Sequence, residues 1–137
     1  MRIRTAAVAA VTGLAVAAAV TYHAWRTAGR EEVRAVTERV AAAAARGDRA
    51  ALAAEPLLHD GDGTADWLLR HGPTLARGYE VGVSRNGEGG FHLIPSAVTH
   101  LGVVKTSAGT LRLGFRYDRE SGRLEFVTAS FSTWPPG

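Results

Sequence analysis

The sequence predicts an α+β fold, in which an N-terminal apolar helix precedes three helices packed on a curved antiparallel sheet of about four strands. Two observations lead to this prediction. Between residues 31 and 76 apolar side chains recur at the helical period, and from Tyr79 onward they alternate with polar ones at the strand period. A helical half followed by a strand half is typical of α+β domains.

The N-terminus begins with a basic segment, residues 1–4, and residues 5–24 then contain no Asp, Glu, Lys or Arg. A helix of that length can cross roughly 30 Å of hydrocarbon. We therefore predict a transmembrane anchor or signal segment over residues 5–25 and a juxtamembrane linker over residues 26–30. Alanine makes insertion marginal, so cleavage as a secretory signal stays open. We expect a single-pass protein of the cell membrane with residues 31–137 outside the cytoplasm, or alternatively a secreted domain.

Composition argues against several classes of function. The chain has no cysteine, which removes disulfides, thiol catalysis and thiolate metal sites. Its net charge is +3, but Arg2 and Arg4 supply two of these charges, and the other basic residues are interspersed with Asp and Glu. A cationic stripe for phosphate binding is therefore not expected, and we predict no nucleic-acid partner.

The first two helices of the domain have local boundary signals. Residues 31–45 carry an amphipathic pattern, and Gly47 provides its C-terminal stop. Asp48 can cap a second helix over residues 49–54, which Pro56 ends. These signals predict two short helices joined by a tight turn.

A third helical pattern covers residues 66–76, where Pro73 predicts an end or a kink around His71. The loop before it, residues 59–66, places acidic side chains at some positions of a calcium-binding loop. Ala65 occupies the position that requires glycine and His71 the position that requires a bidentate glutamate, so we predict no calcium site. The spacing of the nearby histidines defines no zinc tetrahedron either. We expect no metal and no cofactor.

The strand half begins at Tyr79, where apolar and polar residues alternate. Turn residues separate three further strands, over residues 97–106, 110–117 and 123–133. In the last strand the apolar residues change phase, which predicts a β-bulge near Val127. The residues expected on the buried face of the last two strands are Leu111, Leu113, Phe115, Tyr117, Leu124 and Phe126.

This order of elements resembles the cone-shaped fold of the nuclear transport factor two-like and ketosteroid isomerase-like (cystatin-like cone) superfamily. The likeness covers residues 31–133. It rests on residues 40–52, with their Gly-Asp joint between two helices, and on the final hairpin of residues 111–117 and 123–126. The chain looks similar to small, N-terminally anchored bacterial members, which often have no assigned activity.

An enzyme on such a cone needs an acid or base inside its pocket and a donor opposite it. The residues that qualify are His92, His100, Tyr79 and Tyr117, and they form no evident acid/base pair. We therefore predict a membrane-anchored, extracytoplasmic domain without catalytic activity, which binds an envelope protein or a small apolar ligand. Tyr79, His100 and Tyr117 are the candidate ligand-binding residues.

Two alternatives remain open. One is an isomerase- or dehydratase-like enzyme with His100 or His92 as base and Tyr117 as donor. The other is a structural assembly subunit that pairs through its open sheet face. A polar pair at the bottom of a deep pocket favours the enzyme, a filled interior favours the interaction domain, and an exposed apolar sheet face favours assembly.

Overall fold

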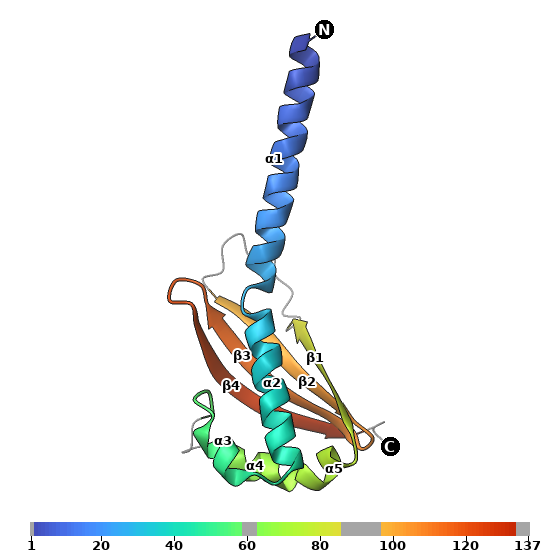
Figure 1. Ribbon diagram of the computed structural model, residues 1–137, viewed down its shortest axis with the longest axis vertical. Helices are drawn as coiled ribbons and strands as arrows, with labels where there is room; N and C mark the ends of the chain where they lie inside the picture. The colour runs from blue at the N-terminus through green and yellow to red at the C-terminus, as the bar shows by residue number, and fades with distance from the viewer. Residues whose placement is uncertain (1, 59–62, 86–96, 134–137) are drawn as a thin grey trace.

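A computed structural model describes residues 2–58, 63–85 and 97–133 of the chain. Its elements are α1 (Arg2–Thr27), α2 (Arg30–Ala45), α3 (Arg49–Ala54), α4 (Thr64–Arg70), α5 (Gly72–Ala76), β1 (Tyr79–Arg85), β2 (Ala97–Thr106), β3 (Gly109–Asp118) and β4 (Arg123–Thr133). The four strands form one antiparallel sheet in the order β1-β2-β3-β4. Helix α2 lies along one face of this sheet, and α3, α4 and α5 gather at its lower end (Figure 1). The α+β class and the four-stranded antiparallel sheet agree with the sequence.

The predicted set of helices is wrong, because the described residues form five helices instead of an apolar helix followed by three. The third helical pattern is divided in two. Helix α4 ends at Arg70, and Pro73 lies in the first turn of α5. Proline has no backbone N–H and fits only in the first turn of a helix, so the chain starts a new helix there instead of continuing the old one.

The N-terminal prediction also needs correction. Within the described part of the chain, no helix combines the length and the hydrophobicity that crossing a membrane requires. This finding overturns the transmembrane anchor over residues 5–25 and the single-pass membrane localisation. A membrane contact through residues 5–24 stays a prediction. Alanine is the strongest helix former but contributes little to transfer into lipid, so a helix can form here without being a strong membrane span.

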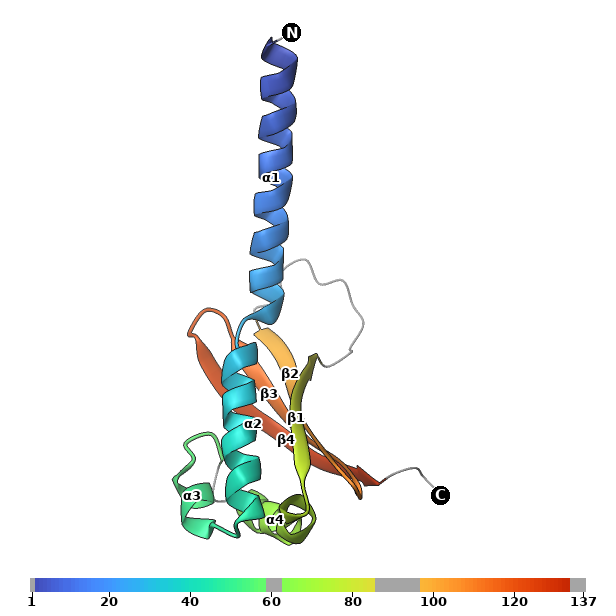
Figure 2. The ribbon, with the colours of Figure 1, turned by 45° about the vertical axis from the view of Figure 1, so that its right-hand side comes forward.

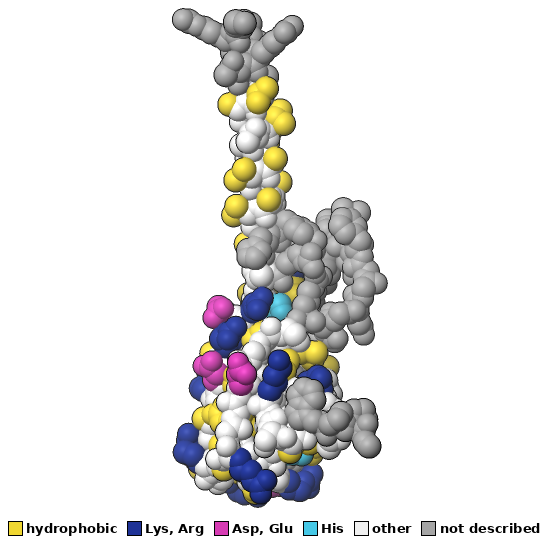
Figure 3. All heavy atoms as spheres, turned by 90° about the vertical axis from the view of Figure 1, so that its right-hand side faces the viewer, with side chains coloured by type: hydrophobic (Ala, Val, Ile, Leu, Met, Phe, Trp, Pro, Cys, Tyr) yellow, Lys and Arg dark blue, Asp and Glu magenta, His cyan; other side chains and the backbone are white. Residues whose placement is uncertain are grey.

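Helix α1 projects away from the sheet and the other helices (Figures 1 and 2). Its hydrophobic side chains lie on the surface of the helix (Figure 3). The exposed bulky members are Val8, Val11, Leu14, Val16 and Val20.

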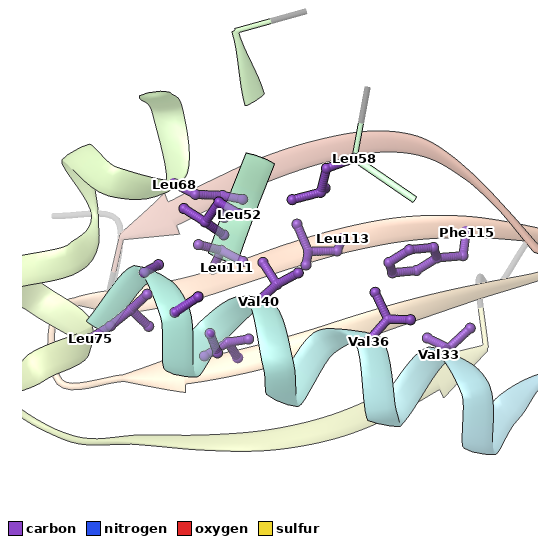
Figure 4. Close-up of a cluster of buried hydrophobic side chains, with 14 residues drawn as sticks. Val33, Val36, Val40, Leu52, Leu58, Leu68, Leu75, Leu111, Leu113 and Phe115 are labelled. Carbon is purple, nitrogen blue, oxygen red and sulfur yellow. The ribbon is translucent and has the colours of Figure 1, made fainter. Parts of the chain in front are cut away.

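The hydrophobic core lies between α2 and the concave face of the sheet. Val33, Val36 and Val40 point from α2 toward Leu113 and Phe115 of β3 (Figure 4). Leu113 and Phe115 have no exposed surface. The helices at the lower end close this core with Leu52, Leu68 and Leu75. Each such side chain contributes about 1.5–3 kcal/mol of transfer free energy, so this layer holds the domain together.

A β-bulge interrupts the pairing of β3 with β4. Gly114 pairs with Thr128, but the next residue, Phe115, pairs with Phe126, which leaves Val127 as the extra residue. This confirms the bulge predicted near Val127. The bulge changes the phase of β4, so that the apolar residues on both sides of it face the core.

Candidate functional site

The concave side of the sheet is filled by side chains. Val33, Val104, Leu113 and Phe115 are completely buried there. The buried hydroxyl of Thr37 donates to the carbonyl oxygen of Val33 at 2.7 Å, inside its own helix. This part of the concave face is therefore filled by core residues.

His100 of β2 lies inside this domain with 2% of its surface exposed. Its Nε2 is 2.8 Å from the carbonyl oxygen of Ala28, which lies in the turn between α1 and α2. A carbonyl only accepts, so Nε2 carries the proton and donates. Burial lowers the pKa of the imidazole; the hydrogen bond to Ala28 opposes this shift, and the charges of Arg30 and Arg119 add to it. His100 is therefore a neutral ring with a structural partner.

Tyr117 contacts the same turn. The pairing of Val98 with Tyr117 and of His100 with Phe115 places Tyr117 and His100 at one end of the concave face. Gly29 has φ +81°, and a Cβ at this position would lie 2.7 Å from Cδ2 of Tyr117. The ring thus packs directly on the glycine that turns the chain from α1 into α2.

Tyr79 lies at the opposite end of the sheet. It pairs with Thr106, which is six residues from His100 along β2, a distance of about 20 Å at roughly 3.3 Å per residue. Its side chain is 38% exposed. The structure therefore brings His100 and Tyr117 together and leaves Tyr79 apart. His92 lies outside the described residues.

An open groove lies at the β3–β4 hairpin and has a volume of about 680 Å³. We call it the hairpin groove, and its lining residues are Pro56, Leu57, Arg116, Asp118, Ser121, Arg123, Leu124, Glu125 and Phe126. Pro56 and Leu57, which come after α3 in the chain, form one wall, and the hairpin forms the other. A second hollow, of about 200 Å³, lies on β1 and β2 beside Val103.

Charges in the hairpin groove are paired across the strands. Arg116 lies opposite Glu125, and Asp118 lies opposite Arg123. Opposite charges at facing positions stabilise an antiparallel pair, and here they also balance the groove electrically. Leu57, Leu124 and Phe126 line the same groove and provide its apolar surface.

Sequence reasoning missed the hairpin groove because its two walls are far apart in the chain. The pairing of the two hairpin strands can be predicted from the sequence, because the turn over residues 118–122 places Arg116 opposite Glu125. Nothing local, however, places Pro56 and Leu57 beside that hairpin.

Metal binding has no support in the described part of the chain, where no three His, Asp or Glu side chains come close enough to hold an ion. Of the acidic loop considered above, Thr64, Ala65 and Asp66 lie in α4, and residues 59–62 lie outside the described residues.

No protein-family model matches the chain, and comparisons with curated proteins and with solved structures find no significant match.

Proposed function

We propose that this chain is a protein-interaction domain without catalytic activity. The filled concave face carries this proposal, because Val104, Leu113 and Phe115 occupy the space that a substrate would need. The residue best suited to act as a base, His100, is only 2% exposed, and its Nε2–H donates to the backbone of the α1–α2 turn. The proposal includes a relation to the nuclear transport factor two-like superfamily, which the helix lying along a curved four-stranded sheet supports.

The hairpin groove is the proposed binding surface. Four successive residues of β4, residues 123–126, line it, and it combines apolar side chains with charges of both signs. Leu57 and Phe126 provide apolar contacts, while Arg123 and Glu125 provide partners for opposite charges. A small apolar molecule would cover these charged side chains without providing hydrogen-bond partners of its own, which weakens its binding.

A charge reversal tests the proposal. Arg123→Glu places two acidic residues opposite each other at the groove, with Asp118 as the facing residue. Lys105→Glu is the matched control, because Lys105 also faces an acidic residue, Glu80, but lies away from the hairpin groove. We expect affinity capture to recover a polypeptide with the wild type and with Lys105→Glu, and to lose it with Arg123→Glu.

Two outcomes contradict this function. The first is capture that recovers no polypeptide sensitive to Arg123→Glu, together with a small apolar molecule found by native mass spectrometry. The second is turnover in a substrate screen that His100→Gln abolishes while the fold is retained. That second result favours the isomerase-like alternative.

A further inference from the structure

The outer edge of β4 is free of any described strand. The sheet order places β4 at one edge, and the strand has 11 residues. An edge strand presents a row of unpaired N–H and C=O groups, and proteins usually protect it with charges, proline or short length. Residues 126–133 contain no charge, proline or glycine. By contrast β1, at the other edge, has 7 residues and includes Glu80 and Arg85.

The apolar layer of the sheet is incomplete along this edge. On β3, Leu111 and Leu113 are 2% and 0% exposed, whereas their partners on β4, Phe131 and Ala129, are only partly buried. The bulge at Val127 leaves the segment from Thr128 to Thr133 as a regular ladder. A further strand added here would cover the exposed sides of Ala129 and Phe131.

The segment is complementary to itself. If two copies run antiparallel about a two-fold axis at Ser130, Thr128 of each lies opposite Ser132 of the other, and Ala129 lies opposite Phe131. Hydroxyl groups then meet on the outer face, and apolar groups meet on the face toward the core. This match of side chains depends on the register, because shifting one strand by one residue would turn each of its side chains to the other face of the sheet.

We infer that two copies of this chain pair through the free edges of β4, with the two-fold axis at Ser130, into one continuous antiparallel sheet. The inference is independent of the proposed function, since the paired segment contains no residue that lines the hairpin groove.

The C-terminal end of α4 contacts the edge strand β4 on the core side of the sheet. The His71 ring lies 4.6 Å from the Phe131 ring and 4.6 Å from the Trp67 ring, measured between centroids. These contacts hold the large Phe131 side chain in place at the edge. In the paired sheet it faces the small Ala129 of the second copy, and a large residue opposite a small one avoids a clash.

Cysteine cross-linking of the full chain tests the axis, because the natural sequence contains no cysteine. Residues facing each other across an antiparallel pair have Cβ atoms about 4.5–5.5 Å apart, close to the spacing that a disulfide needs. We expect Ser130→Cys alone to form a covalent dimer under mild oxidation. Thr128→Cys and Ser132→Cys should each form no disulfide-linked dimer alone and form a disulfide-linked heterodimer when mixed.

The control for reactivity is Thr99→Cys, on the same outer face but on the inner strand β2. Cross-linking that is no stronger for Ser130→Cys than for Thr99→Cys overturns the inference. Cross-linking of Thr128→Cys with itself that exceeds that of Ser130→Cys also overturns it, because the axis would then lie elsewhere.

A charge at the axis tests the association without a covalent bond. Ser130→Lys places two ammonium groups opposite each other, and sedimentation equilibrium should show a dimer weakened by at least about tenfold. Thr99→Lys is matched, since Ser130 faces Arg112 and Thr99 faces Arg116, so each variant sets a lysine against an arginine. A wild type that stays monomeric, or a dimer that Ser130→Lys leaves intact, refutes the pairing.

Discussion

At His100, one ring nitrogen lies 2.8 Å from the carbonyl oxygen of Ala28, a residue 72 positions earlier in the chain. This bond ties β2 to the turn between α1 and α2. The sequence identifies His100 as a strand histidine and a candidate for ligand binding. It cannot identify the acceptor, because no local pattern relates β2 to a turn so far away.

Removing the donor should destabilise the domain. His100→Ala leaves the Ala28 carbonyl without its partner and opens space in the core, so we expect a loss of about 1–3 kcal/mol. His100→Gln retains an N–H donor and should lose less. Urea denaturation of the two variants measures the difference. Equal stabilities of wild type and His100→Ala would show that the bond contributes nothing.

The same residue predicts a dependence of stability on pH. Burial lowers the pKa of His100 in the folded state, so the unfolded chain binds more protons at mildly acidic pH. Stability should therefore be fully present above about pH 6.5, the ordinary histidine value, and fall as the pH drops below it. His71, whose pKa burial also lowers, acts in the same direction.

Because two histidines contribute, His100→Gln should reduce the acid loss and not abolish it. Denaturation curves at pH 7.5 and pH 5 give the loss for each variant. An unchanged loss in His100→Gln would assign the whole effect to other groups and contradict this prediction.

At the scale of elements, α2 packs closely against β2 at Gly102. A Cβ at Gly102 would overlap the hydroxyl of Thr37, a residue with no exposed surface on α2. Gly102→Ala should therefore push the helix from the sheet and cost about 1–3 kcal/mol. Gly82→Ala is the matched control on β1, because its Cβ would meet no atom within 4 Å. Thermal denaturation should show a lower Tm for Gly102→Ala alone, and equal shifts in both variants would argue against close packing.

The elements that the sequence predicts well are those with local signals. Asp48 accepts a hydrogen bond from the backbone N–H of Ala51 at 3.0 Å and caps α3, and Gly47 has φ +67° at the end of α2. The phase change in β4 likewise marks the bulge at Val127. Prediction fails where the structure depends on distant contacts or on a choice between ending and kinking a helix. The sequence predicts one helix interrupted at Pro73, whereas the structure has two helices, α4 and α5. The hairpin groove joins segments that no local pattern connects.

At the scale of the whole molecule, the chain divides into an extended helix and a packed body. Within residues 8–21 of α1 every side chain is exposed, while the core lies between α2 and the sheet. Two contacts between these parts lie at the turn after α1, where His100 binds Ala28 and Tyr117 packs on Gly29. The sequence predicts a separate N-terminal segment, but a membrane anchor there is wrong.

This division predicts that the body folds without α1. A chain starting at Thr27 keeps the Ala28 acceptor and the Gly29 contact. Its free energy of unfolding should lie within about 1 kcal/mol of the full-length value, because the side chains of residues 8–21 are exposed and exposed side chains contribute little to stability.

A chain starting at Arg30 is the matched control. It loses both contacts of the turn and should be less stable by about 1–3 kcal/mol, comparable to the loss of a buried hydrogen bond. Urea denaturation of the three chains measures these differences. If the chain starting at Thr27 is as unstable as the one starting at Arg30, then α1 itself contributes to the stability of the body, and the division at the turn is incorrect.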